Sequence, residues 1–329
     1  MGIAFSFAAV IALIVLAFFG VGLLNLHVLF GVIVPYAAFL IFIIGFVLKV
    51  VKWGRSPVPF RIPTTGGQGY SFPWIKQNKI DSPSSTLGVI VRMLLEILVF
   101  RSLFRNTQSE LKNGKLVHGS EKFLWLFGLI FHWSFLIILI RHFRFFMINV
   151  PYAIKIMEAL DAFFQVGVPL VYITDLTLLL GVTFLFLRRV VMPQIRFISL
   201  PADYFPLFLI FSIGVSGILM RYFIRVDIVG VKQVAMGLVT LNPVAPGSIG
   251  VIFYIHLFLV STLFAYFPFS KLMHLGGVFM SPTRNLANNS RMVRHINPWN
   301  YPVHVHTYAE YEDEFREKMK KAGLPVEKE

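Results

Sequence analysis

The chain has 329 residues, of which 57% are hydrophobic and only 14% are charged, and its formal net charge is +14. Such a composition is far more apolar than that of a soluble domain and indicates an integral membrane protein. The sequence has no cysteine, which excludes disulfides, cysteine-ligated iron–sulfur clusters and covalently attached c-type haem in this chain. Any redox centre must therefore be held by histidine or methionine, or belong to another subunit.

Six apolar runs are long enough to cross the hydrocarbon core of a bilayer, which takes about 20 residues. The first begins MGIAFSF and has neither a basic segment nor a small-residue cleavage site, so we expect a retained span and not a signal peptide. The predicted fold is an all-α integral membrane helix bundle with about six transmembrane helices. The runs cover residues 4–25, 28–51, 123–149, 164–187, 203–224 and 249–275.

Between the second and third runs, residues 87–104 are apolar but carry Arg92, Glu96 and Arg101 about a turn or more apart. This spacing favours an amphipathic helix that lies on the membrane surface. The alternative is a seventh span, which would invert the orientation of every element that follows.

The lysines and arginines are distributed unevenly between the two sides of the predicted bundle. Twenty-four of the thirty lie in segments 49–122, 188–196 and 271–329, on one side. The positive-inside rule places that side, with both termini, in the cytoplasm, so the basic excess is a signal of topology in the cell inner membrane and not of nucleic-acid binding. The other six are Arg141, Arg144, Lys155, Arg221, Arg225 and Lys232.

The chain thus divides into four predicted parts, and the last ends in a charged segment, 308–322, whose order of acids and bases matches a short surface helix. The parts are an N-terminal transmembrane hairpin (1–52), a cytoplasmic loop with the amphipathic helix (53–120), a four-helix domain (121–275) and a cytoplasmic tail for partner docking (276–329).

Four histidines lie inside the apolar runs: His132 and His142 in the third, His256 and His274 in the sixth. A histidine in a bilayer is costly and is seldom kept there without a partner. The third and sixth runs are antiparallel, so His142 lies opposite His256 (the outer pair) and His132 opposite His274 (the inner pair). Two histidines on one iron leave no open coordination position, which suits electron transfer. The sequence therefore predicts two haems, each held between the two helices.

The spacings within the two helices do not match. His132 and His142 are separated by ~15 Å along a helix, whereas His256 and His274, five whole turns apart, are separated by ~27 Å. Helix tilt or a kink at Pro268 would have to absorb the difference of ~12 Å. Hydrogen bonds to neighbouring helices are the alternative role for these histidines.

The other five histidines, His27, His118, His295, His304 and His306, are expected at the surface or in docking regions. Zinc binding at His304 and His306 is an alternative, but two ligands fall short of the four of a closed site.

The histidine spacings are similar to those of the cytochrome b (gamma) subunit of respiratory nitrate reductases. Four segments, FRIPTT, HWSFLIILIRHFRFF, SLPADYFPLF and SPTRNLANNSRMVRHINPWNYP, resemble more closely the DsrM family, the cytochrome b subunits of the sulfite-reduction-associated membrane complex DsrMKJOP. This resemblance covers essentially the whole chain, and its C-terminal motif is specific. The extra first span departs from the nitrate-reductase pattern.

The resemblance implies two haem b groups in the pairing given above and a menaquinone or menaquinol site near the outer haem. It also implies a cytoplasmic iron–sulfur partner, DsrK-like and similar to heterodisulfide reductase, and further membrane and periplasmic subunits similar to DsrJ, DsrO and DsrP. In the nitrate-reductase relatives a lysine beyond the outer haem helps to hold the quinol, and Lys155 is the candidate here, with an ordinary interfacial lysine as the alternative.

Three further polar residues lie near the predicted outer haem. Arg141 and Arg144 flank His142 and are candidates for pairing with haem propionates, or they extend to the lipid headgroups. Asp175 is an intramembrane carboxylate and thus a functional candidate, either as a proton acceptor in quinol oxidation or as a structural hydrogen-bond partner.

The predicted function is electron transfer from menaquinol, oxidised near the outer face, through both haems to a cytoplasmic iron–sulfur subunit docked on 50–120 and 276–329, in dissimilatory sulfur metabolism. The reverse flow, quinone reduction, stays open. A polytopic transporter or proton channel is the alternative, and it predicts broken helices and symmetry between halves. A structural anchor for partner subunits is a third possibility.

Overall fold

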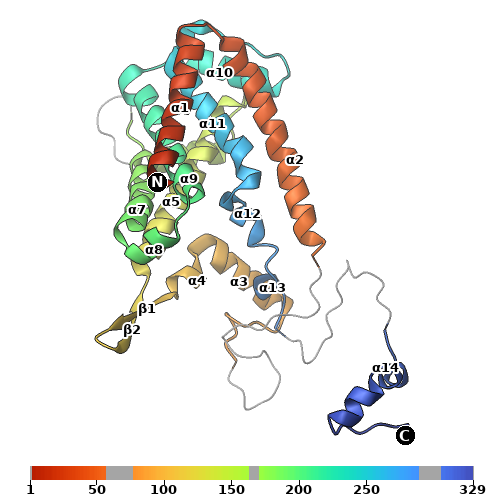
Figure 1. The fold of residues 1–329 in the computed structure, drawn as a ribbon. Coiled ribbons are helices and arrows are strands. Elements are labelled where there is room, and N and C mark those ends of the chain that lie inside the picture. Colours follow the sequence, from red (N-terminus) through yellow and green to blue (C-terminus); the bar gives the residue numbers. More distant parts are fainter. Residues whose placement is uncertain (1, 57–76, 163–169, 289–304, 329) are drawn as a thin grey trace.

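The computed structural model describes residues 2–56, 77–162, 170–288 and 305–328, and these form a bundle of long helices with shorter elements at both ends (Figure 1). By length and composition, five helical segments in the described part of the chain can cross a membrane. The predicted all-α membrane helix bundle is thus confirmed. These segments are Gly2–Gly22, Leu29–Gly54, Lys122–Phe145, Pro201–Ile224 and Val251–Phe269.

The predicted fourth span corresponds to helix α7 (Ile173–Val191), which packs along α5 (Lys122–His142). Helix α7 carries Asp175, Arg188 and Arg189, and for this reason it is more polar than the five segments above. The start predicted for this span falls on residues 163–169, outside the described residues. Two of its charges are paired, because Arg188 contacts Glu121 at 3.0 Å and Asp175 contacts an arginine of α5.

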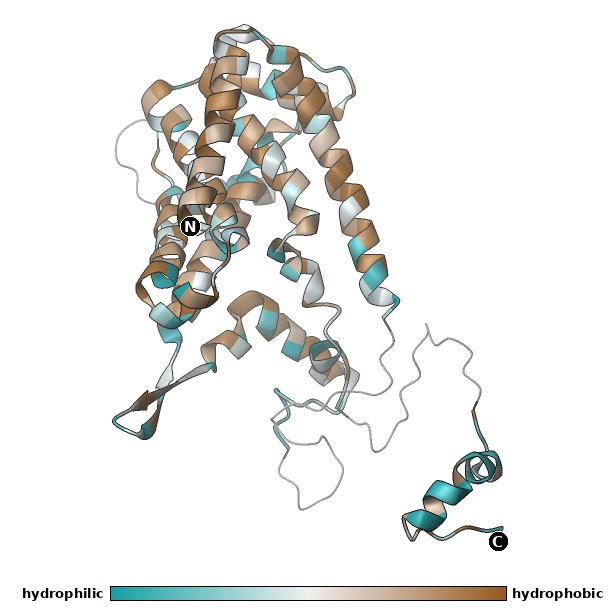
Figure 2. Ribbon diagram, in the orientation of Figure 1, coloured by the Kyte–Doolittle hydropathy of each residue, from teal (hydrophilic) through white to brown (hydrophobic). Residues whose placement is uncertain are grey.

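The first two helices form the predicted N-terminal hairpin. Helix α1 (Gly2–Gly22) is followed by a π-helical turn (η1, Leu29–Ile33) and by α2 (Val34–Gly54). The return is tight at Gly20, where a Cβ atom would lie 2.4 Å from Cε2 of Phe30. Both helices expose large apolar side chains along their length, and hydrophobic residues predominate along the helices of the bundle (Figure 2). A lipid environment accounts for such exposure, since a soluble protein would rarely show so large an apolar patch.

Helix α1 also supplies part of the core. It packs against α9 (Pro201–Ile218) and α11 (Val251–Tyr266), which lie beside it in Figure 1. Two clusters of buried side chains fill the contacts. The first comprises Ala17, Val21, Phe30, Val234, Ile249, Phe253 and Tyr254, and the second comprises Val10, Leu209 and Leu259.

We call the end of the bundle at which α2 stops and α5 begins the basic end, and the opposite end, at which α1 turns into α2, the far end (Figure 1). At the far end, α5 continues into a 3₁₀ turn (η2, Phe143–Phe145), which the short helix α6 (Tyr152–Asp161) follows in the sequence. A second short helix, α10 (Ile228–Val239), comes later in the chain, after α9. Neither short helix was predicted. The third span ends at Phe145, earlier than the predicted residue 149.

The amphipathic helix predicted over 87–104 is interrupted. Helix α3 (Thr86–Val99) begins at the cap residue Ser85, whose side chain accepts a hydrogen bond from Gly88 N. It ends at Phe100, which adopts a left-handed conformation (φ 51°), and α4 (Arg101–Phe104) follows. A bulky residue with positive φ is uncommon, and it separates the predicted helix into two.

Within the described residues, the sheet structure is a hairpin of β1 (Thr107–Lys112) and β2 (Lys115–Ser120), paired antiparallel. Asn113 and Gly114 form its turn, both with positive φ. Asn-Gly is the preferred sequence for such a tight hairpin turn. This hairpin is a small exception to the all-α prediction.

Three short elements complete the middle of the chain. They are the short helix α8 (Pro193–Ile198), the π-helical turn η3 (Leu219–Ile224), which extends α9, and the 3₁₀ turn η4 (Gly247–Ile249), which precedes α11.

The sixth predicted span, 249–275, is not one continuous helix, so this prediction was wrong. Helix α11 ends at Tyr266, and the chain continues through two 3₁₀ turns, η5 (Phe267–Phe269) and η6 (Lys271–Met273), into the short α12 (His274–Gly277). Proline in the first of these turns cannot continue a helix. Ser270, with extended backbone (φ −115°, ψ 175°), separates the two turns and caps the second.

The C-terminal part contains α13 (Pro282–Asn285) and α14 (Tyr308–Lys321). The latter matches the predicted 308–322 helix and begins with a capping box between Thr307 and Glu310. Glu312 on α14 accepts hydrogen bonds from the backbone N–H groups of Glu327 and Lys328, which follow the helix, and these bonds hold the pKa of the Glu312 carboxyl below its usual range.

The contact between α5 and α7 depends on Gly181, where a Cβ atom would lie 2.9 Å from Cβ and 3.1 Å from Cα of Phe131. We expect Gly181→Ala to destabilise the protein by roughly 1–3 kcal/mol, the usual cost of overpacking. Thermal unfolding in detergent measures this. Gly128→Ala on α5 is the control, because its Cβ would meet only Leu103 Cδ2 at 3.6 Å. Equal melting temperatures for both variants would contradict the close approach.

Candidate functional site

The inner pair of histidines faces each other across the bundle. His132 lies in the middle of α5, and His274 is the first residue of α12. Their ring centres are 5.8 Å apart, and the ring planes are nearly perpendicular, at 84°. The ring of Phe100, the residue with positive φ between α3 and α4, lies 5.0 Å from that of His132. The structure thus brings the inner pair together as predicted.

The outer pair is formed by His142, the last residue of α5, and His256 on α11. Their ring centres are 6.4 Å apart, and the ring planes are nearly parallel, at 12°. Each predicted pair therefore contains one residue of α5 and one residue of the α11–α12 region.

Both separations fit two imidazoles that bind one metal ion from opposite sides. A bond of about 2 Å from a metal to each imidazole nitrogen places the two ring centres roughly 6 Å apart. The protein leaves His142 and His274 exposed and the other two rings half-buried, although exposure of an imidazole to lipid is unfavourable. A flat group bound between the two histidines of each pair would cover these rings.

The Nδ1 atom of each paired histidine has a hydrogen-bond partner within the protein. In His132 and His142 it contacts the carbonyl oxygen four residues earlier, at 2.7 Å in both cases. In His274 the partner is Lys271 O at 2.8 Å, and in His256 it is Ser216 Oγ at 2.9 Å.

These contacts decide which ring nitrogen can bind a metal. A carbonyl oxygen only accepts, so Nδ1 carries the proton and Nε2 carries the free lone pair. Ser216 Oγ also contacts Ile213 O, and a hydroxyl that donates there can accept from His256. Among the described residues, no hydrogen bond occupies Nε2 of any of the four. Each ring is thus oriented as a metal ligand with the supporting hydrogen bond that such ligands have in proteins.

The end of α11 at Tyr266 accounts for the mismatch in spacing. On a continuous helix His274 would lie ~27 Å from His256, too far to pair with His132 when His142 pairs with His256. Because the chain leaves the helix and continues through two short turns, His274 comes within 5.8 Å of His132 instead. The predicted helical separation of these two residues was wrong, and the predicted pairing is present.

Next to the outer pair lies a buried cluster of charges around Arg141. Its guanidinium contacts Asp175 Oδ1 at 2.6 Å and Asp161 Oδ2 at 3.1 Å, and it stacks 3.7 Å from the ring centre of Tyr172. The hydroxyl of Tyr222 donates to Asp175 at 2.8 Å. Both candidate residues, Arg141 and Asp175, thus lie in one closed network.

A second arginine, Arg221, also stacks on the Tyr172 ring, with its guanidinium carbon 4.0 Å from the ring centre, and it donates a hydrogen bond to Leu170 O. The Asp161 carboxylate receives hydrogen bonds from N and Oγ1 of Thr174, at 2.9 and 2.6 Å. Two carboxylates and two guanidiniums are therefore gathered around one aromatic ring, and their charges balance.

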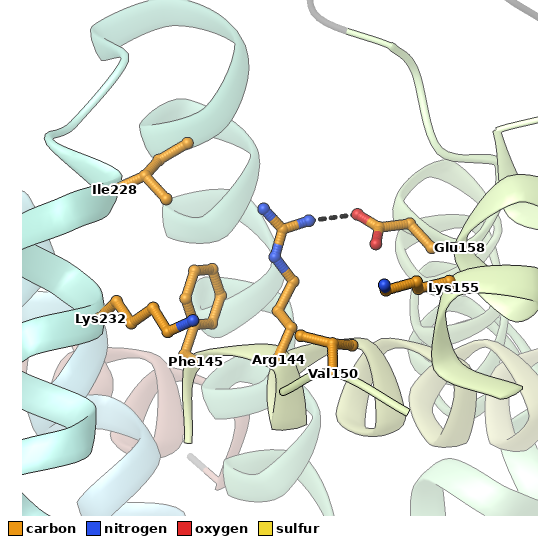
Figure 3. Close-up of a pocket in the computed structure, with 7 residues that line it drawn as sticks. All are labelled: Arg144, Phe145, Val150, Lys155, Glu158, Ile228 and Lys232. Carbon is orange, nitrogen blue, oxygen red and sulfur yellow. Dashed lines mark hydrogen bonds and ion pairs between the residues drawn. The ribbon is translucent and has the colours of Figure 1, made fainter. Parts of the chain in front are cut away.

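The other candidates line a cavity of about 300 Å³ at the far end. Figure 3 shows Lys155 of α6 and Lys232 of α10 pointing toward the space around Arg144 from opposite sides. Arg144 forms an ion pair with Glu158. The ring of Phe145, which also lines the cavity, lies 5.9 Å from that of His142. The cavity is therefore one aromatic ring away from the outer pair. Val150 and Ile228 complete its lining.

The remaining histidines are placed apart from this site. His27 Nδ1 contacts Asn25 O, and its ring lies 5.1 Å from that of Tyr254. His118 contacts Ser109 Oγ on the hairpin. The described residues contain no group of three or more potential metal ligands. His295 and His304 lie outside the described part of the chain, and so does the alternative of zinc at His304 and His306.

Comparison with known proteins identifies the family of this chain. Its residues 90–296 match the nitrate reductase gamma subunit family. This chain belongs to that family. It is also 47% identical over 279 residues to the Hdr-like menaquinol oxidoreductase cytochrome b-like subunit of Archaeoglobus fulgidus, with 83% of each chain covered. A protein of the same name from Archaeoglobus profundus is 44% identical over 273 residues, which cover 80% of this chain and 81% of that protein.

The match to the nitrate reductase gamma subunit family contains all four paired histidines, the Arg141 cluster and the cavity. Helices α1 and α2 precede the matched residues. The resemblance to this family that the sequence predicted is confirmed. The names of both relatives describe a cytochrome b-like subunit, which agrees with the predicted class of protein.

Among the residues of the site that were not predicted are Ser216, Glu158 and Asp161. Ser216 is one of several serines in the apolar runs, and nothing in the sequence relates it to His256. Glu158 and Asp161 are acids three positions apart in a mainly apolar segment, a signal that would have marked them as candidates by the same argument as Asp175.

Arg141 provides a test of the buried cluster. Removing one partner of a buried ion pair leaves uncompensated charge and costs about 3–5 kcal/mol, so we expect Arg141→Met to lower thermal stability strongly. The control is Arg144→Met. The side chains of Arg144 and Glu158 are 30% and 24% exposed, against 8% and 3% for Arg141 and Asp161, and exposed pairs contribute about 1 kcal/mol or less. Similar losses of stability in both variants would show that the cluster does not stabilise the fold.

Proposed function

We propose that this chain is the di-haem cytochrome b subunit of a membrane menaquinol oxidoreductase complex. The observation that carries the proposal is the geometry of the two histidine pairs, with ring centres 5.8 and 6.4 Å apart and every Nε2 free of a protein partner in the described residues. The printed name of the Archaeoglobus relatives, a cytochrome b-like subunit of a menaquinol oxidoreductase, supports it.

One haem b is assigned to each pair: His132 with His274, and His142 with His256. When bound, each haem supplies an iron that accepts and passes on one electron at a time. The protein orients the imidazoles and sets the spacing. Arg141 and Arg144 are already engaged by carboxylates, and we assign them an electrostatic contribution to the outer haem, with direct contact to a propionate as the finer hypothesis.

The cavity at Lys155 is the proposed menaquinol site. Its volume of about 300 Å³ is at the lower end of the range for small-molecule pockets, which suits a ring whose isoprenoid tail extends into lipid. Lys155, Lys232 and Arg144 offer hydrogen-bond donors to quinone oxygens. Asp175 does not line this cavity, and we propose that its role is to orient the side chain of Arg141.

Electrons then flow from the far end to the basic end. We place the bundle in the inner membrane of the cell with its basic end on the cytoplasmic side, because the lysines and arginines concentrate at that end. A cytoplasmic iron–sulfur subunit similar to heterodisulfide reductase (DsrK-like) docks there on the 50–120 and 276–329 segments. The term Hdr-like in the relatives' name supports this partner. Subunits similar to DsrJ, DsrO and DsrP, and a role in dissimilatory sulfur metabolism, rest on the resemblance to the DsrM family.

A transporter is the alternative function, and the broken helix at Pro268 is the feature that it predicts. In this structure the break places His274 opposite His132, where a haem ligand is required. The purified protein distinguishes the two functions by its optical spectrum, since the absence of haem b bands in the reduced-minus-oxidised difference would favour a transporter.

The assignment of the pairs predicts the haem content of variants. We expect His142→Ala, His256→Ala and the double variant each to retain one haem per chain, because either change opens the same site. Combining His142→Ala with His132→Ala is expected to remove both haems. The measurement is the haem-to-protein ratio of the purified protein. Loss of both haems in the His142→Ala, His256→Ala double variant would contradict this pairing.

The ring angles predict two different electron paramagnetic resonance signals. Parallel axial imidazoles split the iron orbitals of low-spin ferric haem strongly and give a rhombic spectrum with three resolved g-values. Perpendicular imidazoles leave the orbitals nearly degenerate and give one strongly anisotropic low-field signal. With plane angles of 12° and 84°, the oxidised protein should show one signal of each type. His256→Ala should remove the rhombic one alone, and two rhombic signals in the unaltered protein would contradict the inner geometry.

A further inference from the structure

The cavity near the outer pair is lined by three cationic side chains and a single carboxylate, within the residues that the structure describes. The cations are Arg144, Lys155 and Lys232, and the carboxylate is Glu158. Oxidation of a quinol releases two protons as well as two electrons. Lysine and arginine are protonated at neutral pH and cannot take up these protons, whereas a carboxylate can.

The other two acids nearby are engaged elsewhere. Asp161, one turn along α6 from Glu158, is held by Thr174 and Arg141, and Asp175 is held by Arg141 and Tyr222. Neither lines the cavity. Their charges are compensated within a closed network, which removes them from direct contact with a ligand in the cavity.

Glu158 is held in place and remains accessible. Its Oε1 atom receives the hydroxyl of Tyr172 at 2.5 Å and a guanidinium N–H of Arg144. Both contacts use the same oxygen, and no hydrogen bond to Oε2 is present among the described residues. The side chain is 24% exposed, so a proton taken up there has a route to water at the far end. In Figure 3 the carboxylate faces the interior of the cavity.

We propose that Glu158 is the proton acceptor for quinol oxidised in this cavity, an inference that rests on the proposed function. In each of two successive steps a quinol O–H bond breaks, its proton forms an O–H bond at Glu158, and one electron is taken up by the oxidised haem that His142 and His256 would hold. Between the steps the proton leaves Glu158 for water on the far side, and the electron passes on to the inner pair's site, so that the outer site can accept the second electron. Tyr172 is a positioning residue, because its hydroxyl orients the carboxylate and does not reach the cavity lining.

The arrangement also accounts for the position of Phe145. Its ring lies between the cavity, which it lines, and the ring of His142, 5.9 Å away. The electron acceptor and the proton acceptor are therefore on different sides of the same cavity, and the two products of quinol oxidation separate as they form.

The test uses the full protein with both haems and its partner subunits. Glu158→Gln keeps the size of the side chain and removes the base. We expect it to retain both haems and to bind a naphthoquinone analogue within about threefold of the unaltered affinity. The rate at which a menaquinol analogue reduces the outer haem should fall by about 10²–10⁴-fold, the usual contribution of a general base.

The second readout is the proton itself. The infrared difference spectrum between reduced and oxidised protein should contain a protonated-carboxyl band that is absent from Glu158→Gln. Glu158→Asp should restore part of the rate and, with it, the decline in rate at low pH that a carboxylate base produces. Asp227→Asn is the control, since it neutralises a carboxylate that caps α10 at the same end and lies outside the cavity lining; its rate should not change.

Three outcomes would overturn the inference. An unaltered rate in Glu158→Gln would show that the proton goes elsewhere. Loss of analogue binding in step with the rate would show that Glu158 binds the quinol and is not its base. Failure of a menaquinol analogue to bind or to reduce the haems of the unaltered protein would overturn the proposed function, and this inference with it, and so is distinct from the first two.

Discussion

The four hydrogen bonds at the Nδ1 atoms of the paired histidines are the constraint on which the site depends. They fix the rotation of each imidazole and leave Nε2 without a hydrogen-bond partner among the described residues. Three acceptors are backbone carbonyls of the local chain, so those rings are oriented by main-chain geometry alone. His256 differs, because its partner, Ser216, comes from α9. The outer pair therefore depends on three packed helices, whereas the inner pair depends on α5 and the turns after α11.

The buried cluster around Arg141 fixes the position of the end of α5, which carries His142 of the outer pair. Arg141 directly precedes His142, and its two ion pairs join the end of α5 to α6 and α7. Charges of this kind are costly in a membrane interior unless they are paired, and Tyr172, between Arg141 and Arg221, brings the compensating groups together. Because both acids are engaged there, the carboxylate that lines the cavity is Glu158, which is paired with Arg144 and Tyr172 through Oε1 alone among the described residues. The cluster thus connects the stability of the far end with its proposed chemistry.

The sequence was sufficient for the histidine pairing, since a polar ring in an apolar run is conspicuous and antiparallel order leaves only one sensible pairing. The sequence named a kink at Pro268 as one way to reconcile the spacings, and α11 does end two residues before it, but the sequence was insufficient to predict the two turns that follow. The apolar pattern continues to residue 275, and hydrophobicity does not report whether backbone hydrogen bonds continue with it. Phe100 illustrates another limit, because neither its left-handed backbone nor its ring contact with His132 has a signal in the local sequence. Ser216 and Glu158 acquire their roles only through neighbours that are distant in the sequence.

In the proposed function, helix α5 sets the electron path, because it contributes one histidine to each pair. The ten residues between His132 and His142 separate the two ligands by ~15 Å along the helix axis, about half of the ~30 Å hydrocarbon thickness. A rigid helix cannot change this spacing, whereas the turns after Tyr266 can adjust His274 to meet it. The break in the other helix is thus the adaptable part and α5 the invariant one. With the proposed proton acceptor at the end of α5 beyond His142, protons stay at the far side while electrons move inward, and the same helix separates the two charges across the membrane.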